Sequence, residues 1–253
     1  MKNKIAIALI SPRTDITVTY IDKNGKTAYV DITEEEAERY YDAELYKGNV
    51  SVGILRKEKN KDKKTLKLEL FENSEVKIGD KLKINSQLIC KGDMLYSSDI
   101  VSEISRILKE NVDLVKQLNE KQIYFTDVLC GFDLIRLNQA EFFDVILPIY
   151  LVNSDENFKS GNGAGVVFKD KRFILDTAKR DYISKICNDA SLNYQIFIGD
   201  AGTMLENLKC SSKNADIIPI AIPCKHLKTR LQEVSANDIK SASELLKLLI
   251  EKE

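Results

Sequence analysis

The sequence predicts an α/β fold built on a largely parallel sheet. From residue 98 onward, segments with the apolar spacing of helices alternate with short apolar runs that are typical of strands. One run, residues 217–222, has no polar alternation, as expected for a strand covered on both faces. The chain has 253 residues, of which 43% are hydrophobic, so it can bury a core of this kind.

The first third of the chain predicts mainly strands. Residues 4–10 are an apolar run, and residues 16–21 and 27–32 are predicted to form a hairpin, because Asn24-Gly25 supplies the positive φ angles of a tight turn. Thr33 with Glu36 forms a capping box, which predicts a helix from residue 33 to about residue 46. Three short strands are predicted at 51–55, 66–71 and 81–84, with a charged, solvated hairpin tip at 56–67.

The remaining elements follow the alternation of strand and helix. A helix is predicted from residue 98, and a last helix from about residue 236 with Ser235 or Asn237 as its cap. Between them the pattern predicts strands at 122–130, 143–152, 165–169, 194–198 and 217–222, and helices at 132–139, 177–190 and 203–208. Residues 1–30 and 92–253 are therefore predicted to form the α/β domain, and residues 31–91 a small β-rich insertion.

Composition excludes several classes of function. The net charge is −1 with 30% charged residues, so no global field attracts nucleic acid or an anionic membrane. The five cysteines lie far apart without a CxxC pair, which argues against a disulfide framework and favours a reducing cytoplasm. No apolar segment approaches the roughly 20 residues that cross a bilayer. We therefore expect a cytoplasmic protein with neither a nucleic-acid nor a membrane partner.

A series of segments, taken in order, resembles a known family. These are KIAIALISPRTDITVTYIDKNGK, VKIGDKL, KGDMLYSSDI, QIYFTDVLCGF, DVILPIYLV, GNGAGVVF, FIGDAGTML and IAIPCKHLK. Together they resemble the tetrahedral aminopeptidases, the glutamyl or deblocking aminopeptidase family of two-metal exopeptidases. The resemblance implies a three-layer α/β/α domain with a small β-rich inserted domain. It also implies removal of N-terminal residues from peptides, with two metal ions holding a bridging water and a Glu as general base.

The resemblance places non-ligating residues where that chemistry needs imidazoles and carboxylates. The His-x-Asp pair falls on Ile10 and Pro12, the consecutive Glu pair on Val128 and Leu129, and the last His on Lys228. The two Asp ligands fall on Tyr96 and Tyr150. A shift of one or two residues would bring Asp99, Asp127 or His226 into such a position, but no shift restores the set. We expect no metal and no other cofactor.

Two features leave functional alternatives open. Gly199-Asp200-Ala201-Gly202 matches the family's Gly-Thr-Asp-Ala-Gly element, either as a helix start or as a retained subsite for a peptide amino group. Gly161-x-Gly163 is predicted to be a turn and not a phosphate loop, because no Lys-Ser or Lys-Thr follows in frame.

Cys224 and His226 form the other candidate site. His226 is the only histidine, so a nucleophile–base pair or a metal site completed by Asp200 would need it. Neighbouring loop positions rarely face each other well enough for proton transfer, which favours a passive loop.

The leading hypothesis is a non-catalytic aminopeptidase-like protein, a pseudoenzyme, that acts as a partner subunit or as a peptide-binding or assembly component. The partner would be a protein or peptide, for example a paralogous subunit, in a homo- or hetero-oligomer. The alternative is an active peptidase or hydrolase with a relocated site around Asp200, Cys224 and His226.

Overall fold

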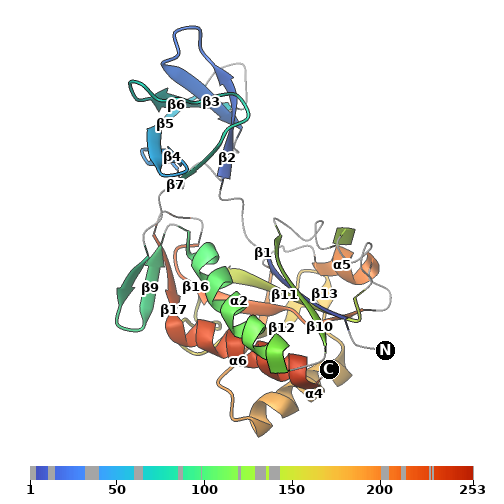
Figure 1. Cartoon of the computed structure of the whole chain (residues 1–253). Helices are drawn as coiled ribbons and strands as arrows, with labels where there is room; N and C mark the ends of the chain where they lie inside the picture. The colour runs from blue at the N-terminus through green and yellow to red at the C-terminus, as the bar shows by residue number, and fades with distance from the viewer. Residues whose placement is uncertain are drawn as a thin grey trace.

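The protein combines an α/β part with a small β-barrel, which stand at opposite ends of the molecule in Figure 1. The predicted α/β fold with a β-rich insertion is thus confirmed. The computed structural model describes residues 4–10, 15–31, 40–59, 65–84, 88–97, 99–118, 121–128, 135–136, 143–200, 205–211, 215–227, 229 and 231–252.

Within the described residues, the α/β part is built on an eight-stranded sheet. Its strands are β1 (Lys4–Ile10), β10 (Gln122–Val128), β11 (Val145–Asn153), β12 (Gly165–Asp170), β13 (Phe173–Ile174), β14 (Gln195–Gly199), β15 (Asp216–Ile217) and β16 (Ile220–Cys224). β10, β1, β11 and β16 run parallel, whereas β12 is antiparallel to β16 and β14 is parallel to β12. The central strands are buried along nearly their whole length, as their unbroken apolar runs require.

The apolar run at 217–222, predicted as one strand, forms two. β15 pairs with the start of β11, and β16 pairs with its end. Pro219 lies between them and has no backbone N–H to donate to a ladder, although its carbonyl accepts a bond from the Val167 N–H at 3.0 Å. Proline therefore divides the run without removing it from the sheet.

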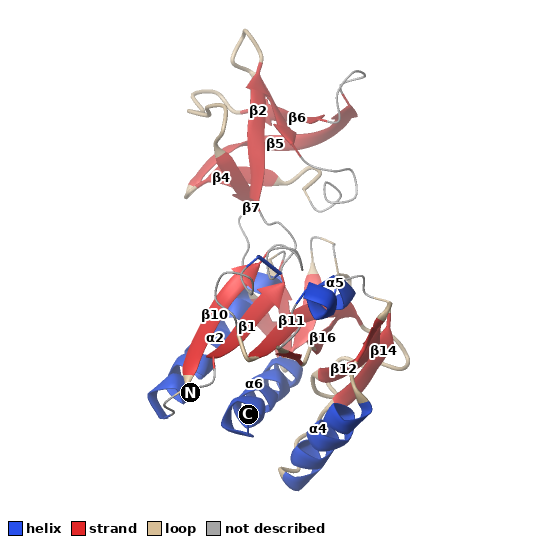
Figure 2. Ribbon diagram, turned by 90° about the vertical axis from the view of Figure 1, so that its right-hand side faces the viewer, coloured by secondary structure: helices blue, strands red, loops and turns tan. Residues whose placement is uncertain are grey.

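Helices cover both faces of this sheet. α2 (Ile100–Leu118), α4 (Thr177–Asp189) and α6 (Ala236–Lys252) form one layer, and Figure 2 shows α5 (Leu205–Ser211) on the other side of the sheet. Side chains cap the starts of two of these helices. At α2, Asp99 accepts from the Ser102 N–H and hydroxyl, and at α6, Ser235 Oγ accepts from the Asn237 N–H. The predicted helix at 132–139 lies outside the described residues except for 135–136, which are helical.

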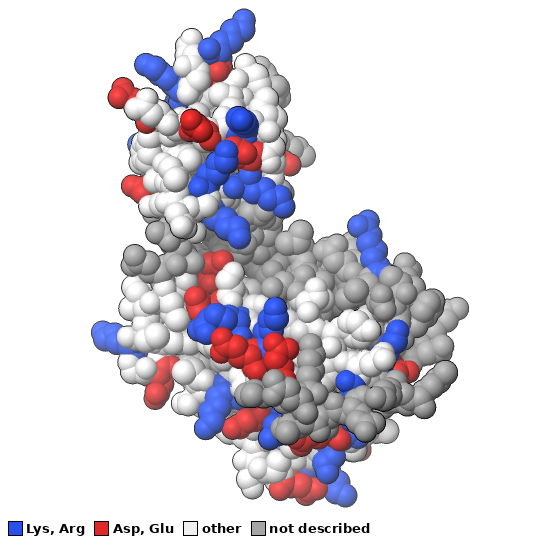
Figure 3. Space-filling model, viewed as in Figure 1, with Lys and Arg blue, Asp and Glu red and all other residues white. Residues whose placement is uncertain are grey.

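A small sheet lies beside the ends of α2 and α6. It joins β8 (Ile89–Lys91), β9 (Met94–Ser97) and β17 (Gln232–Ser235). Elsewhere the surface carries both signs of charge, and Figure 3 shows Lys and Arg interspersed with Asp and Glu over this face. Arg106 on α2, for example, pairs with Glu103 and Glu110.

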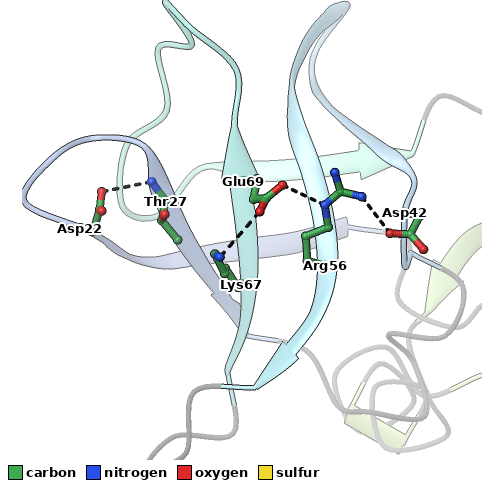
Figure 4. Close-up of polar contacts among 6 residues, drawn as sticks. All are labelled: Asp22, Thr27, Asp42, Arg56, Lys67 and Glu69. Carbon is green, nitrogen blue, oxygen red and sulfur yellow. Dashed lines mark hydrogen bonds and ion pairs between the residues drawn. The ribbon is translucent and has the colours of Figure 1, made fainter.

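The barrel closes in the order β2, β3, β6, β5, β4, β7. Its strands are β2 (Asp15–Ile21), β3 (Thr27–Asp31), β4 (Glu44–Lys47), β5 (Val50–Lys59), β6 (Thr65–Leu70) and β7 (Lys81–Ile84). The predicted β2–β3 hairpin is confirmed: Gly25 has φ 66°, and Asp22 Oδ1 accepts from the Lys26 and Thr27 N–H groups. Figure 4 shows the bond from Thr27. On the barrel surface Arg56 bridges Glu69 and Asp42, and its hydrogen bond lowers the pKa of the Glu69 carboxyl.

The structure moves two predicted boundaries. β2 and β3 fall in the segment 1–30 that was assigned to the α/β domain, but they pair with β6 and β7 and belong to the barrel. The predicted helix at 33–46 does not reach residue 46, because β4 starts at Glu44; residues 32–39 lie outside the described residues. Both errors have one cause, since local patterns reveal a hairpin or a helix start but not the sheet to which the next residues pair.

Candidate functional site

Three of the positions matched to metal ligands lie side by side at one edge of the sheet. Ile10 ends β1 and pairs with Val128 of β10 on one side and with Tyr150 of β11 on the other. We call Ile10, Val128 and Tyr150 the Ile10 row. Because the carboxyl ends of parallel strands are where open α/β sheets place their sites, this is the region in which a catalytic centre would be sought.

The Ile10 row offers no metal ligand. Ile and Val have no lone-pair donor, and Ile10 packs against the hydrophobic core. Tyr150 is 2% exposed, and its hydroxyl donates a 3.1 Å hydrogen bond to Oδ2 of Asp170 at the end of β12. Asp170 is itself 2% exposed, so the phenol supplies a partner to a carboxyl group that burial would otherwise penalise. The tyrosine is therefore tied into the interior.

The other matched positions are dispersed or lie outside the described residues. Tyr96 is in β9, opposite Glu233 of β17, and Glu233 also holds the Lys225 ammonium at 2.5 Å. This hydrogen bond raises the pKa of Lys225. Pro12, Leu129 and Lys228 are not among the described residues. Proline and leucine have no ligating side-chain atom, and a lysine ammonium has no lone pair, so their chemistry follows from the sequence alone.

The structure describes the side chains of two of the three residues that a shift of register would offer as ligands. Asp99 caps α2 through its bonds to Ser102, which commits its carboxylate to the helix start. Asp127 pairs with Leu9 one step before the Ile10 row, and its side chain is not described. His226 is exposed on a turn after β16, with φ 55° and its carbonyl bonded to Thr229.

Asp200, Cys224 and His226 do not form one site. Cys224 is 0% exposed in the core, with Sγ 3.3 Å from the Lys225 carbonyl, whereas His226 is exposed. Gly165 of β12 pairs with Ala221 of β16 on one side and with Gln195 of β14 on the other. Because β12 is antiparallel to β16 and parallel to β14, the strands β14 and β16 run in opposite directions from this row. Asp200 therefore follows the opposite end of the strands from His226. Its side chain is 71% exposed and 3.8 Å from Lys171. Ala201 and Gly202 lie outside the described residues.

The described residues of the Ile10 row do not fit a two-metal centre. In the part of the chain that the structure describes, no three His, Cys, Asp or Glu side chains are grouped closely enough to hold a metal ion. Such a centre needs imidazole and carboxylate ligands from several strand ends. The Ile10 row supplies only aliphatic and phenolic side chains at three strands that meet there.

The Gly161–Gly163 turn is bound from within the protein. Gly161 and Gly163 have φ 92° and 94°, and both N–H groups donate to the buried Asp238 of α6 at 2.8–3.1 Å. The Gln195 amide bonds to the Lys159 N–H and carbonyl and to the Gly163 carbonyl. Because these N–H groups already donate to an internal carboxylate, they are not free to bind a phosphate. Sequence reasoning identified the turn and missed Asp238, since only the fold brings the two together.

Comparisons with known proteins support the fold. No family model matches the chain, and no curated protein matches it. Among solved structures, it is similar to the TET aminopeptidase of the marine sediment archaeon Thaumarchaeota archaeon SCGC AB-539-E09, with 17% identity and a TM-score of 0.78 over 99% of this chain and 82% of that one. Aminopeptidase APDkam598 from the archaeon Desulfurococcus kamchatkensis is also similar, with 15% identity and a TM-score of 0.77 over 100% of this chain and 80% of that one. At such identities the likeness establishes the aminopeptidase-like fold.

A third similar structure is the TET1 peptidase of Pyrococcus horikoshii, with 14% identity and a TM-score of 0.73 over 98% of this chain and 84% of that one. That peptidase assembles into a tetrahedron or a large octahedral shell. Separately, none of the helices in the described part of the chain is both long enough and apolar enough to cross a membrane.

Proposed function

We propose that this chain is a non-catalytic aminopeptidase-like protein, a pseudoenzyme that acts as a partner subunit or as a peptide-binding or assembly component. The observation that carries the proposal is the Ile10 row. Ile10 and Val128, which end β1 and β10, lie in one row with Tyr150 of β11, and these are the positions that the resemblance matches to metal ligands or to the general base.

The contacts of Tyr150 favour the loss of the metal site over a shift of its ligand by one residue along β11. Its hydroxyl bonds to the buried Asp170, so the residue at this position packs and hydrogen-bonds inside the protein. A neutral phenol is a poor ligand for zinc beside the imidazoles, thiolates and carboxylates that proteins use. The strand pairing that would position a metal centre is retained, while its ligand chemistry is absent from the matched residues.

The proposed binding role is supported by the retained fold. The fold is that of proteins named as aminopeptidases, some of which assemble into shells. For this chain we propose a cytoplasmic homo- or hetero-oligomer with a protein or peptide partner, for example a paralogous subunit. Size-exclusion chromatography with and without a candidate subunit distinguishes a heteromeric component from a free peptide reader, because only the former changes its elution volume.

The decisive experiment measures metal content and peptidase activity of the purified chain. We expect no stoichiometric zinc, cobalt or manganese after incubation with each metal, and no cleavage of aminoacyl or short peptide substrates. An active aminopeptidase of the same fold, loaded with metal in parallel, serves as the positive control. Two tightly bound metal ions per chain would contradict the proposal.

Substitution of Cys224 and His226 tests the alternative of a relocated site. If any hydrolytic activity is found, Cys224→Ala and His226→Ala should abolish it under the alternative. Since Cys224 is buried and His226 is exposed, we expect both variants to leave any such background unchanged. Because Cys224→Ala leaves a small cavity, Cys224→Ser provides a second variant of similar volume.

A further inference from the structure

In the described part of the chain, the strand β14 has one edge that pairs with no other strand. Among the described strands it pairs only with β12, and Figure 2 shows it at the outer side of the sheet. The Gln195 N–H donates to the Ala164 carbonyl, and the Gly199 carbonyl accepts from the Lys171 N–H. Residues 195, 197 and 199 therefore direct their backbone groups toward β12. By alternation, Ile196 and Ile198 direct their N–H and C=O groups to the outer edge.

The same two residues expose apolar side chains. Ile196 is 45% exposed and Ile198 is 67% exposed, whereas Phe197 between them is buried. Lys169 of β12 pairs with Ile198 on one side and with Ile174 of β13 on the other. Ile174, which is 49% exposed, therefore lies in the same cross-strand row as Ile198. Sheet edges usually carry lysine, proline or a bulge that prevents pairing with another chain. β14 reads QIFIG and carries neither a charge nor a proline, and the irregularity in its pairing with β12 lies on β12, between Val167 and Lys169, so the outer edge of β14 is open to pairing.

The strand is complementary to itself when a second copy is turned antiparallel. If Phe197 lies opposite Phe197 of the second copy, Ile196 of each chain lies opposite Ile198 of the other, which gives two Ile–Ile pairs. Charge at the two ends of β14 does not set the direction of pairing. Lys159, exposed, is bonded through its backbone to Gln195 at the start of β14, and the exposed Asp200 follows its end. Asp200 is already 3.8 Å from Lys171 of its own chain, so the antiparallel direction rests on the pairing of Ile196 with Ile198.

We propose that β14 is a homodimer interface at which two copies pair antiparallel about a two-fold axis through Phe197. The N–H and C=O groups of Ile196 and Ile198 exchange hydrogen bonds with those of Ile198 and Ile196 in the second copy, which joins the two sheets. Such an interface is isologous and therefore closes at two subunits. A contact centred on one short strand is at the small end of protein interfaces, so we expect a reversible dimer whose population depends on concentration. The inference holds whether or not the chain is catalytic.

Sedimentation velocity of the full chain, from low micromolar to sub-millimolar concentrations, tests the interface. We expect a concentration-dependent dimer, with slower hydrogen exchange of the Ile196 and Ile198 amides at high concentration. Ile198→Lys places a lysine in each of the two apolar pairs and should weaken the dimer about 100-fold or more. The matched control is Ile78→Lys, because Ile78 is equally exposed at 66% but belongs to the barrel part of the chain.

The control variant should dimerise as the unsubstituted protein does. Ile198 is exposed, so Ile198→Lys is expected to fold, and its circular dichroism and melting temperature verify this. Three outcomes would overturn the proposal: a chain that stays monomeric at every concentration, a dimer that survives Ile198→Lys, or a dimer that Ile78→Lys disrupts equally.

Discussion

At the scale of single residues, Gln232 is the least satisfied side chain in the described structure. It lies in β17 opposite Ser97 and is 0% exposed, yet neither its amide nitrogen nor its amide oxygen has a hydrogen-bond partner. Burying an amide without partners costs roughly 1–3 kcal/mol. Gln195 is the contrasting case, since its amide makes bonds to Lys159 and Gly163.

Replacing Gln232 by methionine should therefore stabilise the protein. We expect Gln232→Met to raise the free energy of unfolding by about 1–2 kcal/mol, because the substitution keeps the volume and removes the unpaired polar atoms. Gln195→Met, the matched control, should lower it by a similar amount, because it leaves the Lys159 and Gly163 backbone groups unpaired. Urea denaturation measures both values. Equal destabilisation by the two substitutions would show that the Gln232 amide has partners after all.

At the scale of elements, the first turn of α6 fastens the loop between β11 and β12. Asp238, 0% exposed, accepts the N–H groups of Gly161 and Gly163. Gly163 cannot be replaced without movement, since a Cβ there would lie 2.2 Å from the Asn193 carbonyl oxygen. Ser241, one turn further along α6, bonds both the Ala164 N–H and that same Asn193 carbonyl. The helix thus orients the loop that leads into β12.

Burial gives this contact a pH dependence. Desolvation raises the pKa of Asp238 to about 6, from the ordinary value of 3.8, although the bonds from Gly161 and Gly163 oppose the shift. Between these pH values the folded protein holds a proton that the unfolded chain has lost, so stability falls as the pH rises through this window. At about 1.4 kcal/mol per pKa unit, the loss is on the order of 3 kcal/mol.

Asp238→Asn removes the titration while its amide oxygen can still accept from both glycines. We expect a fall in stability between about pH 4 and pH 6 for the unsubstituted protein and no such fall for the variant. Urea denaturation across this range measures the difference in slope. Parallel curves for the two proteins would mean that Asp238 does not titrate in this window.

At the scale of the whole molecule, the chain has two separate hydrophobic cores. One cluster fills the α/β part, and the other, which includes Leu55, Leu68 and Leu82, fills the barrel. The two clusters share no residue. A unit with its own core is expected to unfold cooperatively by itself.

Calorimetry should accordingly show two transitions. Leu68 in the barrel and Leu147 in β11 are both 0% exposed, so replacing either by alanine should cost roughly 2–5 kcal/mol in its own core. We expect Leu68→Ala to lower one melting temperature and Leu147→Ala to lower the other. A single transition that both substitutions shift would show instead that the barrel and the α/β part unfold together.

Local features of the fold could be predicted from the sequence, whereas the pairing of distant segments could not. The hairpin of β2 and β3, the cap of α6 by Ser235 and the central strands followed from local chemistry: an Asn-Gly turn, a hydroxyl before a helix, and unbroken apolar runs. The membership of β2 and β3 in the barrel did not. Backbone pairing between distant segments decides it.

The sequence by itself determined what the matched positions cannot do, because Ile, Pro, Val and Leu have no ligating side-chain atom wherever they lie. Only the tertiary structure decided which of these positions meet. The strand register brings Ile10, Val128 and Tyr150 together, and strand direction separates Asp200 from His226. Asp238 with its glycines, the unpartnered Gln232 and the open edge of β14 likewise depend on contacts between residues far apart in the chain, and local patterns carry no record of such contacts.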